Sequence, residues 1–179
     1  KNSLQLIVTG DLHDTKANLR GECTKAMLDT FELAITKPIV LVGNHDRINE
    51  KNPAHALEFL RNSVRLIAEP SLIKDFGYML PYYHDPEELR TYLDAIKVQK
   101  APVFMHQGLQ GSHMGDYPQD KSAINLEDVA GLRIISGHYH NRQTIDLPSG
   151  GKWDYVGNPF TTSYGEAGDL PKGFQILYN

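Results

Sequence analysis

Short apolar runs recur along the chain, and a glycine or a polar cluster closes each of them. The run Leu4–Val8 ends at Gly10, and the run Ile39–Val42 ends at Gly43. Between these runs, residues 19–35 carry apolar side chains at helical spacing, which predicts a helix. A buried strand, a helix and a second buried strand in this order are typical of a βαβ unit with parallel strands.

Two further apolar runs, Val103–Met105 and Leu132–Ile135, predict a third and a fourth buried strand. The rest of the chain changes to short strands and turns that end in residues 173–178. Because large aromatic side chains usually belong to a core, we expect Trp153 and Phe160 to pack under these final strands.

The stretch of sequence between the second and the third predicted strand contains helix and turn signals. Pro53 is a residue typical of a first helical turn, so a helix is expected over residues 55–62. Residues 64–80 predict a pair of short strands. Asp85 precedes Pro-Glu-Glu and is expected to cap a further helix, since a side-chain oxygen at that position accepts a free backbone N–H.

The composition indicates one soluble, intracellular domain. The chain has 179 residues, of which 40% are hydrophobic and 22% charged, and a length of this order supports one sizeable core. Cys23 is the single cysteine, so no internal disulfide can form, and a reducing, cytoplasmic setting is expected. The sequence contains no membrane-length apolar run and no signal-peptide pattern. The net charge is -4, so a nucleic-acid partner would need metal ions or a local basic patch.

Each of the four apolar runs leads directly into polar residues. The polar clusters are Gly10–Asp14, Gly43–Asp46, His106 and Gly137–His140. Each cluster alone is also ordinary turn or surface chemistry. Together they are more specific, because the carboxyl ends of parallel strands meet at one edge of a sheet. Carboxylate, amide and imidazole groups without thiolates suit a divalent metal such as Mn²⁺, Fe²⁺ or Zn²⁺ rather than a structural zinc site.

The ordered set G-D-x-x-D, G-N-H-D, a strand-terminal His and G-H-x-H resembles the calcineurin-like metallophosphoesterase family, over residues 10–140. The closing segments 154–160, 163–166 and 171–174 resemble the nuclease subunits of double-strand-break repair nucleases of bacteria, phages and eukaryotes. The resemblance implies an α/β fold, in which central β-sheets pack face to face with flanking helices. It also implies two divalent metal ions, Mn²⁺ first, with Fe, Zn or Mg as alternatives.

By this resemblance the metal ligands are Asp11, Asn44, His106, His138 and His140. Asp11 would bridge the two metals, and His140 would bind the second of them. His45 would face the substrate as a general acid, and Asp46 would orient His45. Two bridged metals can activate a water for in-line attack on phosphorus, so no protein nucleophile is needed.

Gly10–Asp14 matches either of two family motifs. As D-x-H, it would make Asp11 and His13 ligands of one metal and leave the bridging carboxylate missing. As G-D-x-x-D, it would make Asp11 the bridge and His13 a polar turn residue. One helix and one strand separate Asp11 from Asn44, which favours the second alternative. The first strand–helix segment of the single domain, residues 1–179, would then be absent upstream, and the second metal site would be weak or empty.

These features predict a metal-dependent phosphoesterase, with a phosphodiesterase or nuclease that cleaves DNA favoured. The resemblance further implies an ATPase partner subunit, and no membrane is expected. One alternative is a phosphatase or phosphodiesterase acting on a small phosphoester or a phosphoprotein, since the basic residues form no run. The other is a catalytically weakened binding module of the same fold. Tyr82 and Tyr83 are expected at a solvated strand end.

Overall fold

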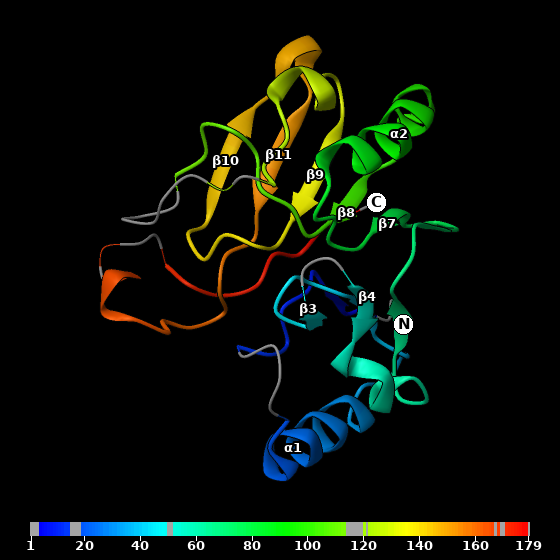
Figure 1. Ribbon diagram of the computed structural model, residues 1–179, viewed down its shortest axis with the longest axis vertical. Coiled ribbons are helices and arrows are strands. Elements are labelled where there is room, and N and C mark those ends of the chain that lie inside the picture. The colour runs from blue at the N-terminus through cyan, green and yellow to red at the C-terminus, as the bar shows by residue number, and fades with distance from the viewer. Residues whose placement is uncertain are drawn as a thin grey trace.

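The fold of the chain is mixed α/β (Figure 1). The computed structural model describes residues 4–14, 19–49, 52–113, 120, 122–166, 168 and 171–178. Within these residues the α-helices are α1 (Gly21–Glu32) and α2 (Pro86–Ile96). The short 3₁₀ helices are η1 (Ala56–Leu60), η2 (Lys97–Gln99), η3 (Leu126–Val129), η4 (Pro148–Gly150) and η5 (Tyr164–Glu166).

A three-stranded parallel sheet contains the predicted βαβ unit. Its strands, in spatial order, are β1 (Ile7–Val8), β2 (Ile39–Leu41) and β5 (Arg65–Ile67). Strand β1 is shorter than predicted, and the expected burial of the run Leu4–Val8 is wrong, since even Ile7 and Val8 are only half-buried. Leu4 is 75% exposed and Leu6 43% exposed. The reason is that β1 is an edge strand, whereas β2 is covered on both sides.

A second sheet has six strands in the part of the chain that the structure describes. In spatial order they are β10 (Gln143–Asp146), β11 (Lys152–Tyr155), β9 (Arg133–Ser136), β8 (Val103–Met105), β7 (Gly77–Leu80) and β6 (Ser71–Ile73). The four inner strands run parallel, and the two edge strands run antiparallel to their neighbours. Strands β6 and β7 form the predicted strand pair. A separate two-stranded ribbon joins β3 (Arg47–Asn49) to β4 (Asn52–His55).

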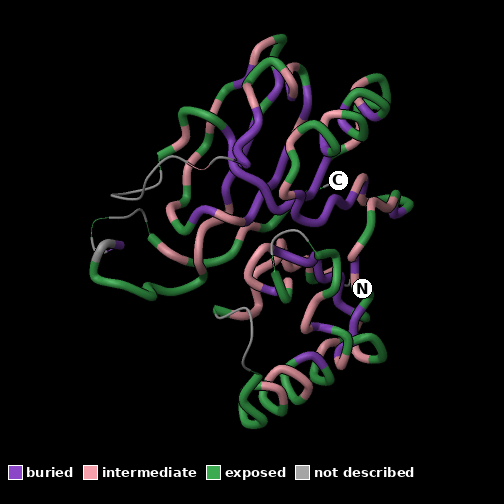
Figure 2. The backbone as a smooth tube through the Cα atoms, in the orientation of Figure 1, coloured by how far each residue is buried: buried purple, intermediate pink, exposed green. Residues whose placement is uncertain are grey.

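The two large sheets share one apolar cluster, because successive side chains of a strand point to opposite faces. Ile39 and Leu41 of β2 contact this cluster, as do Phe104 of β8 and Ile135 of β9. Val40 lies on the other face of β2 and packs with a cluster that includes side chains of α1 and η1. Burial on both faces explains why β2 and β8 are continuous apolar runs. In Figure 2 the buried residues concentrate in the strands, whereas the residues of α1 are largely exposed.

Helix α2 covers the outer face of the six-stranded sheet. It buries Leu89, Leu93 and Ile96, which recur at the spacing of one helix face. Each such burial contributes about 1.5–3 kcal/mol to stability. The predicted N-cap is confirmed, since the Asp85 side chain accepts a hydrogen bond from the backbone N of Glu87 at 2.9 Å.

Three expectations for the elements are wrong. Residues 55–62 do not form an α-helix, because Pro53 lies within strand β4, at an edge where its missing N–H costs no ladder bond. The helical part is the 3₁₀ helix η1, whose Leu57 and Leu60 are buried at the three-residue spacing of that helix. Phe160 is 66% exposed, although Trp153 is fully buried as expected. Residues 173–178 form no strand.

Among the described residues, the structure contains no helix that is both long enough and apolar enough to cross a membrane.

Candidate metal centre

The loop after β1 carries Asp11 in an unusual backbone conformation. Asp11 has φ 54°, in the left-handed region that non-glycine residues seldom adopt, and it follows Gly10 at φ 99°. Such a conformation costs about 1–3 kcal/mol and persists only where the surroundings hold it. The holding group is Asp46, whose carboxylate accepts from the backbone N of Asp11 at 2.9 Å, of Leu12 at 3.0 Å and of His13 at 3.2 Å.

Asp46 is fully buried and also accepts a hydrogen bond from the backbone N of Gly43 at 2.8 Å. One carboxylate therefore joins the loop after β1 to the loop after β2. The expectation that Asp46 orients His45 is wrong. The His45 ring instead places Nδ1 2.7 Å from the carbonyl O of Asp14, and its backbone N donates to Asp11 Oδ1 at 2.9 Å.

His106 follows β8 and lies at the centre of the site, with 1% of its side chain exposed. Its Nδ1 lies 2.6 Å from the carbonyl O of Thr9, and because a carbonyl only accepts, Nδ1 carries the proton. The other ring nitrogen, Nε2, faces Asn44 Oδ1 at 2.9 Å and Asp11 Oδ2 at 3.1 Å. Burial alone lowers the pKa of His106, but the charge and hydrogen bond of Asp11, together with Thr9 and Asp46, outweigh it, so the pKa is raised above its usual value.

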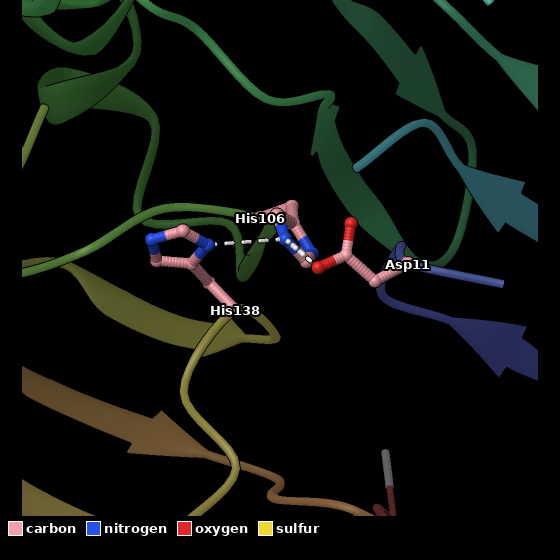
Figure 3. A group of neighbouring side chains, drawn as sticks. All are labelled: Asp11, His106 and His138. Atoms are coloured by element: carbon pink, nitrogen blue, oxygen red, sulfur yellow. Dashed lines mark hydrogen bonds and ion pairs between the residues drawn. The ribbon is translucent and has the colours of Figure 1, made fainter. Parts of the chain in front are cut away.

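His138 follows β9 and has φ 85°. Its Nε2 lies 2.9 Å from the Asp120 carboxylate, which makes Nε2 the protonated nitrogen. Its Nδ1 therefore carries the lone pair and faces Asn44 Oδ1 at 3.0 Å and His106 Nε2 at 3.3 Å. Figure 3 shows this approach of His138 to His106 and Asp11.

Four atoms with lone pairs thus converge: Asp11 Oδ2, Asn44 Oδ1, His106 Nε2 and His138 Nδ1. The ligand atoms of Asp11, His106 and His138 all lie within 4.8 Å of one another. Acceptors gathered in this way repel one another unless a cation or a proton lies between them. One anionic oxygen, one amide oxygen and two imidazole nitrogens match the ligand preference of Mn²⁺, Fe²⁺ or Zn²⁺, so the donor set fits a divalent metal.

Small residues make this convergence sterically possible. A Cβ on Gly43 would lie 2.5 Å from the backbone N of Asp11 and would overlap its carboxylate. A Cβ on Gly137 would lie 2.9 Å from Nδ1 of His106. Glycine at these two positions lets the loops after β2 and β9 approach the centre closely.

His140 is not part of this group. Its side chain is 52% exposed, and its Nδ1 pairs with Glu166 Oε1 at 3.0 Å. Of the predicted ligands, the structure brings together Asp11, Asn44, His106 and His138. Within the described ranges, Asp11, His106 and His138 are the one group of His, Cys, Asp and Glu side chains with metal-binding geometry.

His13 also lies outside the group. Its ring is buried against Phe59, with Nδ1 3.6 Å from Asp46 Oδ1. Neither ring nitrogen of His13 has a hydrogen-bond partner. The structure therefore does not bring His13 together with Asp11 as a ligand pair.

Residues that the sequence did not assign to the site surround it. Asp120 belongs to a stretch of the sequence rich in Gly, Ser, Asp and Pro, where no local pattern singled it out. Glu166 belongs to the closing segment 163–166, which carried a resemblance but no role. Tyr82 is 4% exposed rather than solvated, and its ring centroid lies 5.8 Å from that of His138. Tyr83 is buried as well.

Comparison with known proteins places the chain in no family, because no protein-family model and no curated protein matches it.

Proposed function

We propose that the chain is a metal-dependent phosphoester hydrolase, and that its substrate is a phosphodiester, with DNA favoured. The observation that supports this most is the convergence of Asp11 Oδ2, Asn44 Oδ1, His106 Nε2 and His138 Nδ1 at the ends of different strands. Hydrolases of phosphoesters need a cation to neutralise phosphoryl oxygens, and these atoms provide a place for one.

Asp11, Asn44, His106 and His138 would hold the divalent metal, for which Mn²⁺ is the first candidate. When bound, such a metal polarises a phosphoryl oxygen and lowers the pKa of a water molecule. Thr9 and Asp120 act on the ligands, since each accepts the proton of the imidazole nitrogen that faces away from the centre. Each imidazole is thereby held in the tautomer that turns its lone pair inward.

His45 is the candidate general acid. With Nδ1 donating to the Asp14 carbonyl, its Nε2 is the atom that would carry a proton to the leaving oxygen. The backbone N of His45 donates to Asp11 Oδ1, which ties this side chain to a metal ligand. In this proposal Asp46 has a different task, namely to position the Asp11 loop.

We further propose that the two large sheets and their covering helices represent the layered metallophosphoesterase fold. The apolar cluster that Ile39, Leu41, Phe104 and Ile135 share between the sheets supports this. An ATPase partner remains part of the nuclease proposal and rests on the resemblance of the closing segments.

Two observations favour alternatives. His140 lies outside the group formed by Asp11, His106 and His138, so within the described residues the converging atoms provide for one metal, which favours a catalytically weakened binding module. The net charge of -4 gives no general attraction for DNA, which favours a phosphatase or phosphodiesterase acting on a small phosphoester or a phosphoprotein.

The experiment that tests the proposal measures metal content after saturation with Mn²⁺ and desalting. The wild-type chain is compared with His138→Ala and with His113→Ala, an exposed histidine that serves as control. We expect one metal per chain, lost in His138→Ala and retained in His113→Ala. Wild-type protein without metal, or a His138→Ala variant with undiminished metal, would contradict the proposed site.

Hydrolysis assays then separate the candidate functions. The metal-loaded chain is given a chromogenic phosphodiester, the matching monoester and double-stranded DNA ends. Preference for the diester and for DNA supports the nuclease, and preference for the monoester supports the phosphatase. A chain that binds metal and hydrolyses none of these substrates supports the weakened binding module.

A further inference from the structure

Glu166 is a buried carboxylate at the end of η5, and it gathers several donors. It is 6% exposed. Its Oε1 accepts from Oγ1 of Thr162 at 2.5 Å and pairs with Nδ1 of His140 at 3.0 Å. Its Oε2 pairs with Nζ of Lys172 at 3.0 Å. Burial alone raises the pKa of Glu166, but the hydrogen bonds from Thr162, Lys172 and His140 outweigh it and hold the pKa well below its usual range.

An ionised carboxylate only accepts hydrogen bonds, so the contact with Glu166 decides which nitrogen of His140 carries the proton. Nδ1 must be protonated in order to donate to Oε1. In the neutral ring, Nε2 then carries the lone pair. Because the His140 side chain is 52% exposed, this lone pair lies on a ring that solvent can reach.

The neighbouring histidine of the same G-H-x-H motif is held in the opposite tautomer. His138 donates from Nε2 to Asp120 and keeps its lone pair on Nδ1. Two carboxylates from separate segments thus select opposite tautomers in two histidines that are two residues apart. An unconstrained imidazole in water favours protonation at Nε2, so the arrangement at His140 requires the Glu166 contact.

We propose that Glu166 is a positioning residue that locks His140 in the Nδ1–H tautomer and so makes His140 Nε2 a ligand atom for a divalent cation. The cation-binding half of this inference rests on the proposed function, because His140 would serve metal ions bound near Asp11. The tautomer half rests only on the Glu166 contact.

Lys172 has a different task in the same cluster. Its Nζ is also 2.9 Å from the carbonyl O of His140, so it fastens the closing segment to the His140 loop. Its Nζ binds this carbonyl oxygen and Oε2 of Glu166, whereas the His140 ring pairs with the other carboxylate oxygen, Oε1. The fastening role and the tautomer role can therefore be separated by mutation.

The test is nitrogen NMR of the metal-free full chain labelled with ¹⁵N-histidine, recorded at roughly pH 7.5, above the ordinary histidine pKa. In wild type we expect the His140 Nδ1 to show the shift of a protonated nitrogen and Nε2 that of an unprotonated one. In Glu166→Gln we expect His140 to move toward the Nε2–H tautomer while His138 keeps its own. Lys172→Met and the exposed control Glu69→Gln should leave the His140 tautomer unchanged.

A wild-type His140 in the Nε2–H tautomer would overturn the proposal, and this outcome does not depend on whether any variant folds. An unchanged His140 tautomer in a folded Glu166→Gln variant would overturn it as well. Loss of the tautomer in Lys172→Met would show that the fastening, rather than Glu166, holds the ring, which also overturns it.

Titration with Zn²⁺, a diamagnetic ion, tests the cation-binding half. Shifts at His106 Nε2 and His138 Nδ1 report on the proposed metal centre, and a shift at His140 Nε2 reports on the further inference. A response at all three, with the His140 response lost in Glu166→Gln, supports the inference. A response at His106 and His138 alone overturns the ligand role of His140 and leaves the proposed centre intact, whereas no response at any of them overturns both.

Discussion

The buried Asp46 carboxylate accepts a hydrogen bond from the backbone N–H of Asp11, at 2.9 Å. The same carboxylate accepts the N–H of Gly43 at 2.8 Å, so it connects the loops that follow β1 and β2. Burial and the nearby charge of Asp11 raise the pKa of Asp46, and the backbone hydrogen bond from Gly43 opposes this rise only in part. The strained φ of Asp11, and with it the direction of a candidate metal ligand, depends on this side chain.

We therefore predict that Asp46→Ala destabilises the fold by about 3–5 kcal/mol, because four backbone N–H groups lose their acceptor at up to about 1–3 kcal/mol each, without full additivity. The N–H of Gly43 is buried, and those of Asp11, Leu12 and His13 are partly buried. Asp46→Asn keeps one acceptor oxygen and should cost less, about 1–3 kcal/mol. Both variants should bind Mn²⁺ more weakly than wild type. Urea unfolding gives the stability, and titration calorimetry gives the affinity.

Asp14→Asn is the matched control, since Asp14 is exposed and contacts His45 through its backbone oxygen. It should leave stability and metal affinity within error of wild type. If Asp46→Ala unfolds at the wild-type urea concentration, the assigned role of Asp46 is wrong.

The elements that the sequence predicted well are those whose pattern has a single physical cause. Strands β2 and β8 are buried on both faces, so each is a continuous apolar run. Helix α2 begins after Asp85, whose side chain caps a backbone N–H only two residues further along the chain. Pro53 was misread because the residue fits both a first helical turn and an edge strand. The choice between helix and strand depends on the pairing of β4 with β3, which the local sequence around Pro53 does not reveal.

The same distinction explains the site. Asp11, Asn44, His106 and His138 could be expected together because each follows the carboxyl end of a parallel strand. The expected single sheet edge is wrong, since β1 and β2 belong to one sheet and β8 and β9 to the other. The partners of His45 and His140 could not be predicted, since each pairs with a group chosen by the path of a loop. Asp120 was missed for the same reason, because no local sequence pattern indicates its contact with His138.

Gly43 provides a steric test of the centre. A Cβ there would lie 2.5 Å from the backbone N of Asp11, and neither group can move without breaking the hydrogen bonds to Asp46. We expect Gly43→Ala to cost about 1–3 kcal/mol, as overpacking of a filled site does, and to lower the metal content per chain. Thermal unfolding with and without Mn²⁺ measures both effects, since a ligand bound only by the native state raises the melting temperature.

Gly21→Ala is the control for this substitution. Gly21 begins α1, and a Cβ there meets no atom within 4 Å. Alanine at that position should stabilise the chain by roughly 0.4–1 kcal/mol and leave metal binding unchanged. A Gly43→Ala variant that is as stable as wild type and still binds metal would refute the close packing of the two loops.

Asp128, which is not part of the candidate metal centre, gives a prediction of how the stability of the fold changes at acid pH. Its carboxylate accepts from the Asn125 backbone N and pairs with Arg90 Nε at 2.7 Å, so it links η3 to α2. Burial alone raises the pKa of Asp128, but the hydrogen bond from Arg90 and those from Asn125 outweigh it, and the pKa is lowered. A depressed native pKa contributes stability above the unfolded-state value, about 3.9, and this contribution is lost as the pH falls through the native pKa.

We expect Asp128→Asn to lower stability at neutral pH by about 1 kcal/mol, the usual worth of a cap with a partly exposed ion pair. The difference between wild type and variant should be constant down to roughly pH 4 and should shrink below it, because the wild-type carboxylate is then protonated as well. Urea unfolding of both proteins between neutral pH and roughly pH 3 measures this difference. A gap that widens toward acid pH would mean that Asp128 is not held ionised by Arg90, and that the link between η3 and α2 has another origin.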